Sequence, residues 1–200
     1  MAHQPQIVKG DTIQVLNPEV SKAYYDELRG QKKTYIIDSP KEFLLYLNLL
    51  VPKSTNPEGR YSATLYKTEN NQRSLIYFLD GQGIIWKEYF EEYGGDDYYM
   101  GSEYETNLMP GHYEIEVVGN NLQGKYVLAI GKKEEFPLGV ILKTLVILPQ
   151  LKINFFNVSP LEFFWKSKFG PHVLILLLLI VLIVLGIVIL IIKKVKKNKI

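Results

Sequence analysis

The sequence has no cysteine and only three histidines among its 200 residues. The absence of cysteine excludes disulfide bonds, thiolate zinc sites and thiol redox centres. The short motifs that mark nucleotide-binding loops, serine hydrolases and zinc peptidases are absent as well. Of the histidines, only His112 lies in a segment predicted to fold, at a strand start where we expect a turn residue rather than a catalytic group. The sequence therefore predicts a protein that is not an enzyme.

Charged, hydroxyl and amide side chains are missing from residues 173–192, VLILLLLIVLIVLGIVILII. A helix of this length covers roughly 30 Å, the thickness of the hydrocarbon core of a bilayer. A core helix so uniformly apolar would need a much larger protein around it. We therefore expect a single transmembrane helix over residues 172–192, with the lipid bilayer as its partner.

Lysines are concentrated on the C-terminal side of this apolar segment. The tail at 193–200 holds five lysines, whereas the preceding flank, FFWKSKFGPH, holds two. The positive-inside rule then predicts a cytoplasmic tail and places everything before residue 170 outside. Aromatic rings in the flank suit the depth of the lipid headgroups. The predicted anchor residues are Trp165, Val173, Gly186, Ile192, Lys193 and Lys194.

This orientation requires the N-terminal domain to be exported. The first residues, MAHQPQIVKGDTIQV, contain no apolar run that could serve as a signal peptide. We therefore expect that an export signal has been removed from this chain. The alternative is a tail-anchored protein with a cytoplasmic domain, which would send the lysine tail across the membrane.

Charge divides the chain although the formal net charge is only +2. Residues 1–135 hold 14 Lys and Arg against 20 Asp and Glu, a net charge of −6, while residues 136–200 hold 9 against 1, a net charge of +8. An acidic outer domain is unsuited to binding nucleic acid. An exported domain without disulfides is more typical of a prokaryotic surface than of an animal one.

Strand patterns fill most of residues 1–135. In HYEIEVV, Tyr113, Ile115 and Val117 alternate with two glutamates, which is typical of a half-buried strand. The run FLLYLNLLV is apolar at nearly every position and predicts a central strand covered on both faces. Such short runs indicate a mainly β fold, an antiparallel, jelly-roll-like β-sandwich at 1–135. The expected strands lie within 11–15, 32–38, 42–52, 60–68, 73–80, 112–119 and 125–131.

Residues 110–131, PGHYEIEVVGNNLQGKYVLAIG, contain two turn signals, one at Met109, Pro110 and Gly111 and one at 120–124. We expect the second turn to close a hairpin between the flanking strands. This segment resembles the last hairpin of the bacterial pre-peptidase C-terminal domains. The resemblance implies a jelly-roll-like sandwich that acts as a noncatalytic accessory module on secreted or surface proteins. The whole chain also resembles a type of prokaryotic single-pass surface protein.

Two stretches interrupt the strands. Residues 17–30, NPEVSKAYYDELRG, place Val20, Ala23, Tyr24 and Leu28 at helical spacing, and Gly30 suits a helix C-cap, so we expect a short helix. Residues 84–106 combine aromatic and acidic side chains and are expected to form an inserted loop.

This inserted loop is the most unusual part of the domain, and we consider three interpretations. It is a solvated acidic loop, a surface calcium site beside the Gly94 and Gly95 turn, or an aromatic platform for a glycan or peptide. The candidate calcium ligands are Glu91, Glu92, Asp96, Asp97, Glu103 and Glu105. The candidate ligand-binding rings are Trp86, Tyr98 and Tyr99.

Residues 136–171 are expected to connect the sandwich to the membrane. The apolar part between Pro137 and Pro149 is too short to cross, so we expect a helix lying in the membrane interface, with Lys143 and Lys152 reaching toward headgroups. The alternative is a helix docked on the sandwich itself. A second helix should start at Pro160 and end near 170.

We therefore expect a sandwich at 1–135, an amphipathic connector at 136–171, a span at 172–192 and a cytoplasmic tail at 193–200. The predicted function is noncatalytic: a membrane-anchored surface protein that binds a protein or surface glycan, or takes part in envelope assembly, through strand edges or the aromatic loop. The alternative is a calcium-dependent accessory module of a secreted or surface enzyme system.

Overall fold

The computed structural model describes residues 3–119 and 122–197, with side chains as far as Lys194. The chain divides into two compact units. One unit comprises Met1–Glu91 and Asp96–Pro160, and the other comprises Glu92–Gly95 and Leu161–Ile200.

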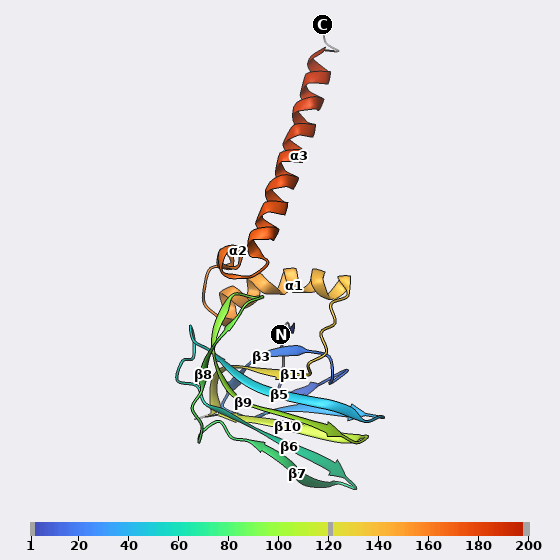
Figure 1. The fold of residues 1–200 in the computed structure, drawn as a ribbon, viewed down its shortest axis with the longest axis vertical. Helices are drawn as coiled ribbons and strands as arrows, with labels where there is room; N and C mark the ends of the chain where they lie inside the picture. The colour runs from blue at the N-terminus through green and yellow to red at the C-terminus, as the bar shows by residue number, and fades with distance from the viewer. Residues whose placement is uncertain (1–2, 120–121, 198–200) are drawn as a thin grey trace. The chain divides into compact units, whose positions relative to one another are not determined.

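Strands make up most of the first unit (Figure 1). They are β1 (Gln4–Ile7), β2 (Thr12–Gln14), β3 (Lys22–Arg29), β4 (Lys33–Ser39), β5 (Phe43–Pro52), β6 (Tyr61–Glu69), β7 (Gln72–Leu79), β8 (Lys87–Glu91), β9 (Asp96–Leu108), β10 (Gly111–Gly119) and β11 (Gln123–Ile130). The helical segments are α1 (Leu138–Gln150), the π-helix η2 (Leu151–Phe155), the 3₁₀ turn η3 (Pro160–Glu162), α2 (Phe163–Lys166) and α3 (Gly170–Lys197).

The strands form two sheets, which confirms the predicted β-sandwich. Sheet A has the order β1-β3-β11-β5-β9-β8, and sheet B has the order β2-β4-β10-β6-β7. Neighbours are antiparallel except for β1 beside β3 and β2 beside β4, which are parallel. Each of the seven expected runs forms a strand in this structure.

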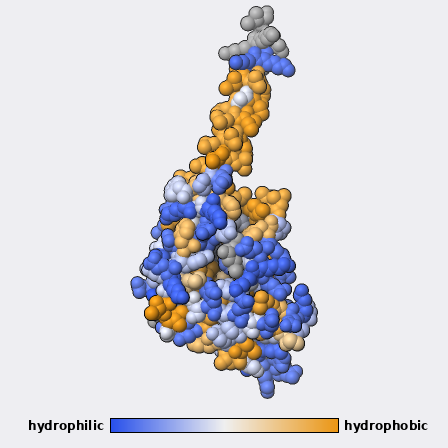
Figure 2. All heavy atoms as spheres, viewed as in Figure 1, coloured by the Kyte–Doolittle hydropathy of each residue, from blue (hydrophilic) through white to orange (hydrophobic). Residues whose placement is uncertain are grey.

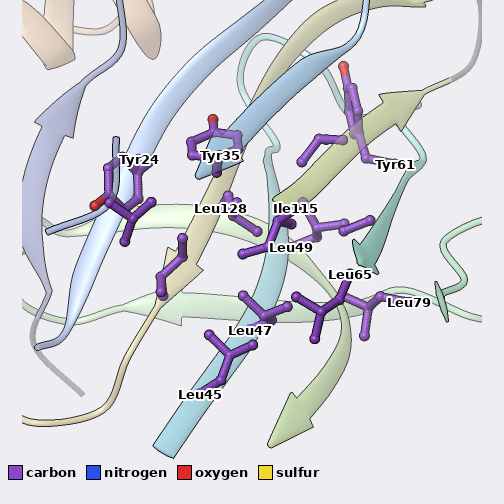
Figure 3. Packing of buried hydrophobic residues seen from close by; sticks show 14 of the residues in the cluster. Tyr24, Tyr35, Leu45, Leu47, Leu49, Tyr61, Leu65, Leu79, Ile115 and Leu128 are labelled. Carbon is purple, nitrogen blue, oxygen red and sulfur yellow. The ribbon is translucent and has the colours of Figure 1, made fainter. Parts of the chain in front are cut away.

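The core consists of the apolar side chains that alternate toward the inside of each sheet. Leu45, Leu47 and Leu49 point inward from β5 and meet Leu65 and Ile115 from sheet B (Figure 3). Because neighbouring strand residues point to opposite faces, other apolar side chains of β5, such as Tyr46 and Leu50, point to the outer face of sheet A.

A buried polar cluster lies within the sandwich. The carboxylate of Asp26 on β3 accepts hydrogen bonds from the hydroxyls of Tyr35 at 2.8 Å and Tyr126 at 2.9 Å. Burial raises the pKa of both tyrosines well above its usual value, so their hydroxyls stay protonated as donors. The cluster joins β4 of sheet B to β3 and β11 of sheet A.

The helix predicted over 17–30 is wrong, because this stretch contains β3. Tyr24, Asp26 and Leu28 point into the sandwich with a strand period of two. Asp26 disguised that period, since a carboxylate was not expected on an apolar face. Gly30 has φ +89° and ends a strand rather than a helix.

The predicted hairpin between 112–119 and 125–131 is also wrong. β10 pairs with β4 and β6 in sheet B, whereas β11 pairs with β3 and β5 in sheet A. A short connection suits an arch between two sheets as well as a hairpin, and strand pairing decides between them. Asn120 and Asn121 lie outside the described residues. The turn at Met109 and Pro110 is confirmed, between β9 and β10.

The inserted loop predicted at 84–106 is an extension of sheet A. β8 and β9 pair in antiparallel register, and β9 continues along β5. The alternation of acidic and aromatic residues, taken as a loop signal, is a strand pattern with one wetter face. The turn at Gly94 and Gly95 is confirmed, between these two strands.

The connector helix does not end at Pro149. Pro137 lies at the N-cap of α1, Pro149 lies inside its last turn, and the chain continues directly into η2. Proline lacks the N–H of a regular helical bond, and a local π-helix is one way to continue past it. The second predicted helix does start at Pro160, but its first turn is 3₁₀ and it ends at Lys166.

We predict that Asp26→Ala destabilises the protein by about 2 kcal/mol or more, because buried tyrosine hydroxyls lose their acceptor. Urea unfolding followed by tyrosine fluorescence measures the change. Arg29→Ala, which removes an exposed pair with Glu27 on the same strand, is the control and should leave the midpoint unchanged. Equal midpoints for the two variants would contradict the structural role of the cluster.

Candidate functional site: binding surfaces

The three rings predicted to form a ligand platform do not come together. Trp86 is buried in the core, and its indole N–H donates to the carbonyl oxygen of Gly81 at 2.8 Å. Tyr98 and Tyr99 are adjacent on β9 and face opposite sides of sheet A. The guanidinium of Arg60 lies 5.6 Å from the ring of Trp86 and 5.9 Å from that of Tyr99. These aromatic side chains serve packing.

The acidic residues predicted to bind calcium are dispersed. Among the residues that the structure describes, no group of three or more acidic or histidine side chains is placed to hold a metal ion. Asp96 is buried against Lys152, whereas Asp97, the next residue on β9, is exposed. Glu92 pairs with Lys168 in the second unit at 3.3 Å. Glu91, Glu103 and Glu105 lie along β8 and β9.

His112 lies at the start of β10, as expected for a turn residue. Its Nδ1 is 2.6 Å from a carboxylate oxygen of Asp38. The hydrogen bond to this carboxylate raises the pKa of the histidine. The pair is largely exposed, which identifies it as a surface contact between β10 and β4.

An open sheet edge is the first unusual surface. β7 is the last strand of sheet B and carries the uncharged run SLIYFL at 74–79. Leu75, Ile76, Tyr77 and Phe78 are 37–61% exposed although all four are large and apolar. Sequence analysis did not single this strand out. The signal was available, because four consecutive apolar residues break the alternation of a half-buried strand.

The second unusual surface is the outer face of sheet A, which the connector covers. Leu151, Phe155 and Phe156 pack against Tyr46, Leu50, Tyr98 and Val127 in a second apolar cluster. The ring of Phe155 lies 5.1 Å from that of Tyr25, with the two planes perpendicular. The prediction that β5 is covered on both faces is therefore confirmed.

A buried ion pair accompanies this packing. Lys152 Nζ lies 2.6 Å from a carboxylate oxygen of Asp96, with the two side chains 1% and 8% exposed. The prediction that Lys152 reaches toward lipid headgroups is wrong. The nearly buried carboxylate holds the ammonium group at the sheet, because separating two buried, opposite charges is costly.

α1 presents an apolar stripe away from the domain. Its outward positions are spaced by three and four residues, as on one face of a helix. They are 43–70% exposed: Leu138, Ile141, Leu142, Leu145 and Val146. The opposite face packs Ile147 against the cluster on sheet A. Figure 2 shows orange, hydrophobic atoms over α1.

The second unit contains the predicted span. α3 begins at Gly170, whose N–H donates to the hydroxyl of Ser167 at 2.8 Å, so a side chain just before the helix satisfies one N–H group of its first turn. Within Gly170–Lys194 it contains an 18-residue apolar stretch without a buried residue, so this helix is long and apolar enough to cross a membrane. Figure 2 shows the same helix as a continuous hydrophobic surface.

The predicted anchor residues lie on these helices. Trp165 is exposed on α2, Val173 and Ile192 lie near the two ends of the apolar part of α3, and Lys193 and Lys194 follow it. A side chain at Gly186 would meet no atom within 4 Å, so its surface on α3 is open.

We predict that excess calcium leaves the melting temperature of the protein unchanged, because the carboxylates of β8 and β9 do not converge on one point. Scanning calorimetry in calcium and in a calcium chelator measures the melting temperature. A clear rise with calcium, absent with magnesium, would restore the calcium site.

We also predict that Lys152→Ala lowers the free energy of unfolding by about 3–5 kcal/mol, because the buried carboxylate of Asp96 loses the opposite charge of Lys152. The double variant Lys152→Met with Asp96→Leu should lose much less, since both charges are replaced by apolar groups. Denaturant unfolding measures both. Lys168→Ala, from an exposed lysine–glutamate pair, is the matched control. Equal losses for the single and double variants would contradict a buried pair.

Comparisons with known proteins add little to this geometry. No protein-family model matches the chain, and no curated protein matches it. Solved structures similar to it include the pre-peptidase C-terminal domain of a collagenase from Bacillus anthracis, with 12% sequence identity, a TM-score of 0.38, and coverage of 62% of this chain and 96% of that domain. A likeness at this score carries no argument about function, and the sandwich assignment rests on the strand pairing itself.

Proposed function

We propose that this protein is a membrane-anchored, noncatalytic module whose β-sandwich binds an apolar, extended segment of another protein chain at the β7 edge. The observation that carries the proposal is the open edge of β7. The outer backbone N–H and C=O groups of an edge strand form a template on which another strand can pair.

The other three sheet edges carry features that oppose such pairing. β1 is four residues long and contains Pro5, and β2 is only three residues long. β8, KEYFE, carries charges at Lys87, Glu88 and Glu91. Short length, proline, charge and β-bulges are means by which natural proteins protect their edges. Between Arg73 and Asp80, β7 carries no proline and no charge, and it has one register shift against β6.

Charge supports an apolar partner. Residues 1–135 carry a net charge of −6, so most of the domain repels acidic surfaces. The run 74–79 is uncharged, and the guanidinium of Arg73 at its start is already paired with Glu114 at 3.3 Å and Glu116 at 2.8 Å. A partner strand with exposed apolar side chains therefore meets no unpaired charge there.

The apolar helix α3 supports a membrane anchor, and the lysine excess after it supports a cytoplasmic tail with the sandwich outside. In this proposal the sandwich presents β7 to proteins of the cell surface or envelope. Catalysis has no part in it.

The experiment uses the absence of cysteine. We expect Leu75→Cys in the full-length protein to form a specific cross-linked adduct in intact cells with a membrane-impermeant, cysteine-reactive photo-cross-linker. Gln14→Cys, on the opposite edge of sheet B, is the matched control and should give none. Adding Phe78→Lys to Leu75→Cys should abolish the adduct, because a charge then faces the partner strand. An adduct of twice the chain mass identifies the partner as a second copy.

Equal adducts from positions 75 and 14, or an adduct that survives Phe78→Lys, would refute the β7 site. Reaction of Leu75→Cys with the impermeant reagent only after permeabilisation would place the sandwich in the cytoplasm and refute the surface location.

A further inference from the structure

We propose that α1 binds the lipid bilayer as an interfacial helix, with its outward apolar stripe at the boundary between headgroups and acyl chains, and that the chain crosses the membrane only once. The inference rests on the membrane anchor of the proposed function and adds a second lipid-binding surface to it. It concerns a different surface from β7, because α1 and η2 pack on sheet A whereas β7 is the last strand of sheet B.

The shape of the helix surface identifies an apolar environment. The stripe from Leu138 through Ile141, Leu142 and Leu145 to Val146 runs along one face of α1. In the described part of the first unit, these side chains remain 43–70% exposed while the other face of the helix packs against the domain. A surface helix in water carries polar residues on its outer face, and here that face is apolar.

Charge and chain position identify lipid as the occupant. Between residues 136 and 161 there is no acidic residue, and Lys143 on α1 is exposed. The ammonium group of Lys143 donates to the side-chain oxygen of Gln6 at 3.4 Å. Lipid contact therefore rests on the apolar stripe, and no acidic side chain of this segment opposes an anionic bilayer surface. The same chain enters α3 at Gly170, soon after α1 and η2 end. A helix connected so closely to a membrane span is within reach of the bilayer surface.

Length alone would allow α1 to cross the membrane. The continuous segment Leu138–Phe155 is also long and apolar enough to cross a membrane, although it is less apolar than α3. If both segments crossed, the sandwich and the C-terminal tail would lie on the same side of the membrane. The number of spans therefore sets the topology of the protein.

The contacts of η2 exclude α1 as a span. Lys152 is buried in its ion pair with Asp96, and the carbonyl oxygen of Phe155 accepts hydrogen bonds from Thr55 and Lys125, each at 3.0 Å. A crossing segment would have to break these contacts and carry the lysine into hydrocarbon. With η2 fixed to sheet A, only the outward face of α1 is free to meet lipid.

The experiment places a single environment-sensitive fluorophore on cysteine in the full-length protein, reconstituted in vesicles of phosphatidylcholine and phosphatidylglycerol. Leu142→Cys reports on the stripe, Val181→Cys on α3 and Leu75→Cys on β7. We expect Leu142→Cys to show blue-shifted emission that is quenched more strongly by a nitroxide at headgroup depth than by one at the bilayer centre. Val181→Cys should show the reverse order, and Leu75→Cys should show no quenching.

Preferential quenching of the Leu142 probe by the deep nitroxide would overturn the proposal in favour of a second span. Absence of quenching there, with Val181→Cys still quenched, would overturn it in favour of a stripe covered by protein or left in water. Loss of quenching at Val181 would instead refute the membrane anchor, so the two failures are distinct.

A second variant tests the stripe itself. Leu145→Glu, which replaces an outward residue, should abolish the quenching of the Leu142 probe while leaving that of the Val181 probe unchanged. Thr144→Glu on the inward side is unsuitable as a control because it would disturb packing. Gln150→Glu, at the exposed end of α1, adds the same charge outside the stripe and should leave the quenching in place.

Discussion

The rest of the structure depends on one constraint, the burial of β5 on both faces. The strand is apolar at nearly every position, so its inner side chains need sheet B and its outer side chains need another cover. In an antiparallel sandwich, the outer face of a sheet is usually solvated. Here that face is closed by Leu151, Phe155 and Phe156 from the connector. The segment that precedes α3 and covers this face is therefore part of the folded β unit.

The cover also explains why a lysine lies within an apolar segment. Lys152 of η2 lies 2.6 Å from the carboxylate of Asp96 on sheet A. Apolar packing is not directional, so the ion pair adds a directional contact to the apolar packing of the connector on the sheet.

The two exposed apolar surfaces, the β7 edge and the outward stripe of α1, differ in the chemistry that they offer to a partner. β7 offers backbone hydrogen-bonding groups together with apolar side chains, which suits a polypeptide strand. α1 has its backbone groups satisfied within the helix and offers apolar side chains alone, which suits lipid. In the proposed function, these two elements of the first unit would contact a protein partner and a membrane separately.

The sequence by itself determined the elements whose signals are local. The uncharged run at 173–192 specifies a helix long and apolar enough to span a membrane, and the alternation in HYEIEVV specifies a strand, without reference to other residues. Tertiary structure decided the rest. Residues 22–29 form a strand in which Asp26 is buried because its carboxylate accepts hydrogen bonds from two tyrosine hydroxyls. β10 and β11 do not form a hairpin because they pair with strands of different sheets. The sequence suggested a calcium site from the carboxylates and a ligand platform from the aromatic rings because it does not show which face of the sheet each side chain occupies. In the structure, Tyr98 and Tyr99 face opposite sides of sheet A. The Lys152–Asp96 pair joins residues far apart in the chain, and the β7 edge exists because no further strand follows it in sheet B. Side-chain periodicity predicts neither, because it does not tell which distant strand pairs with a given strand.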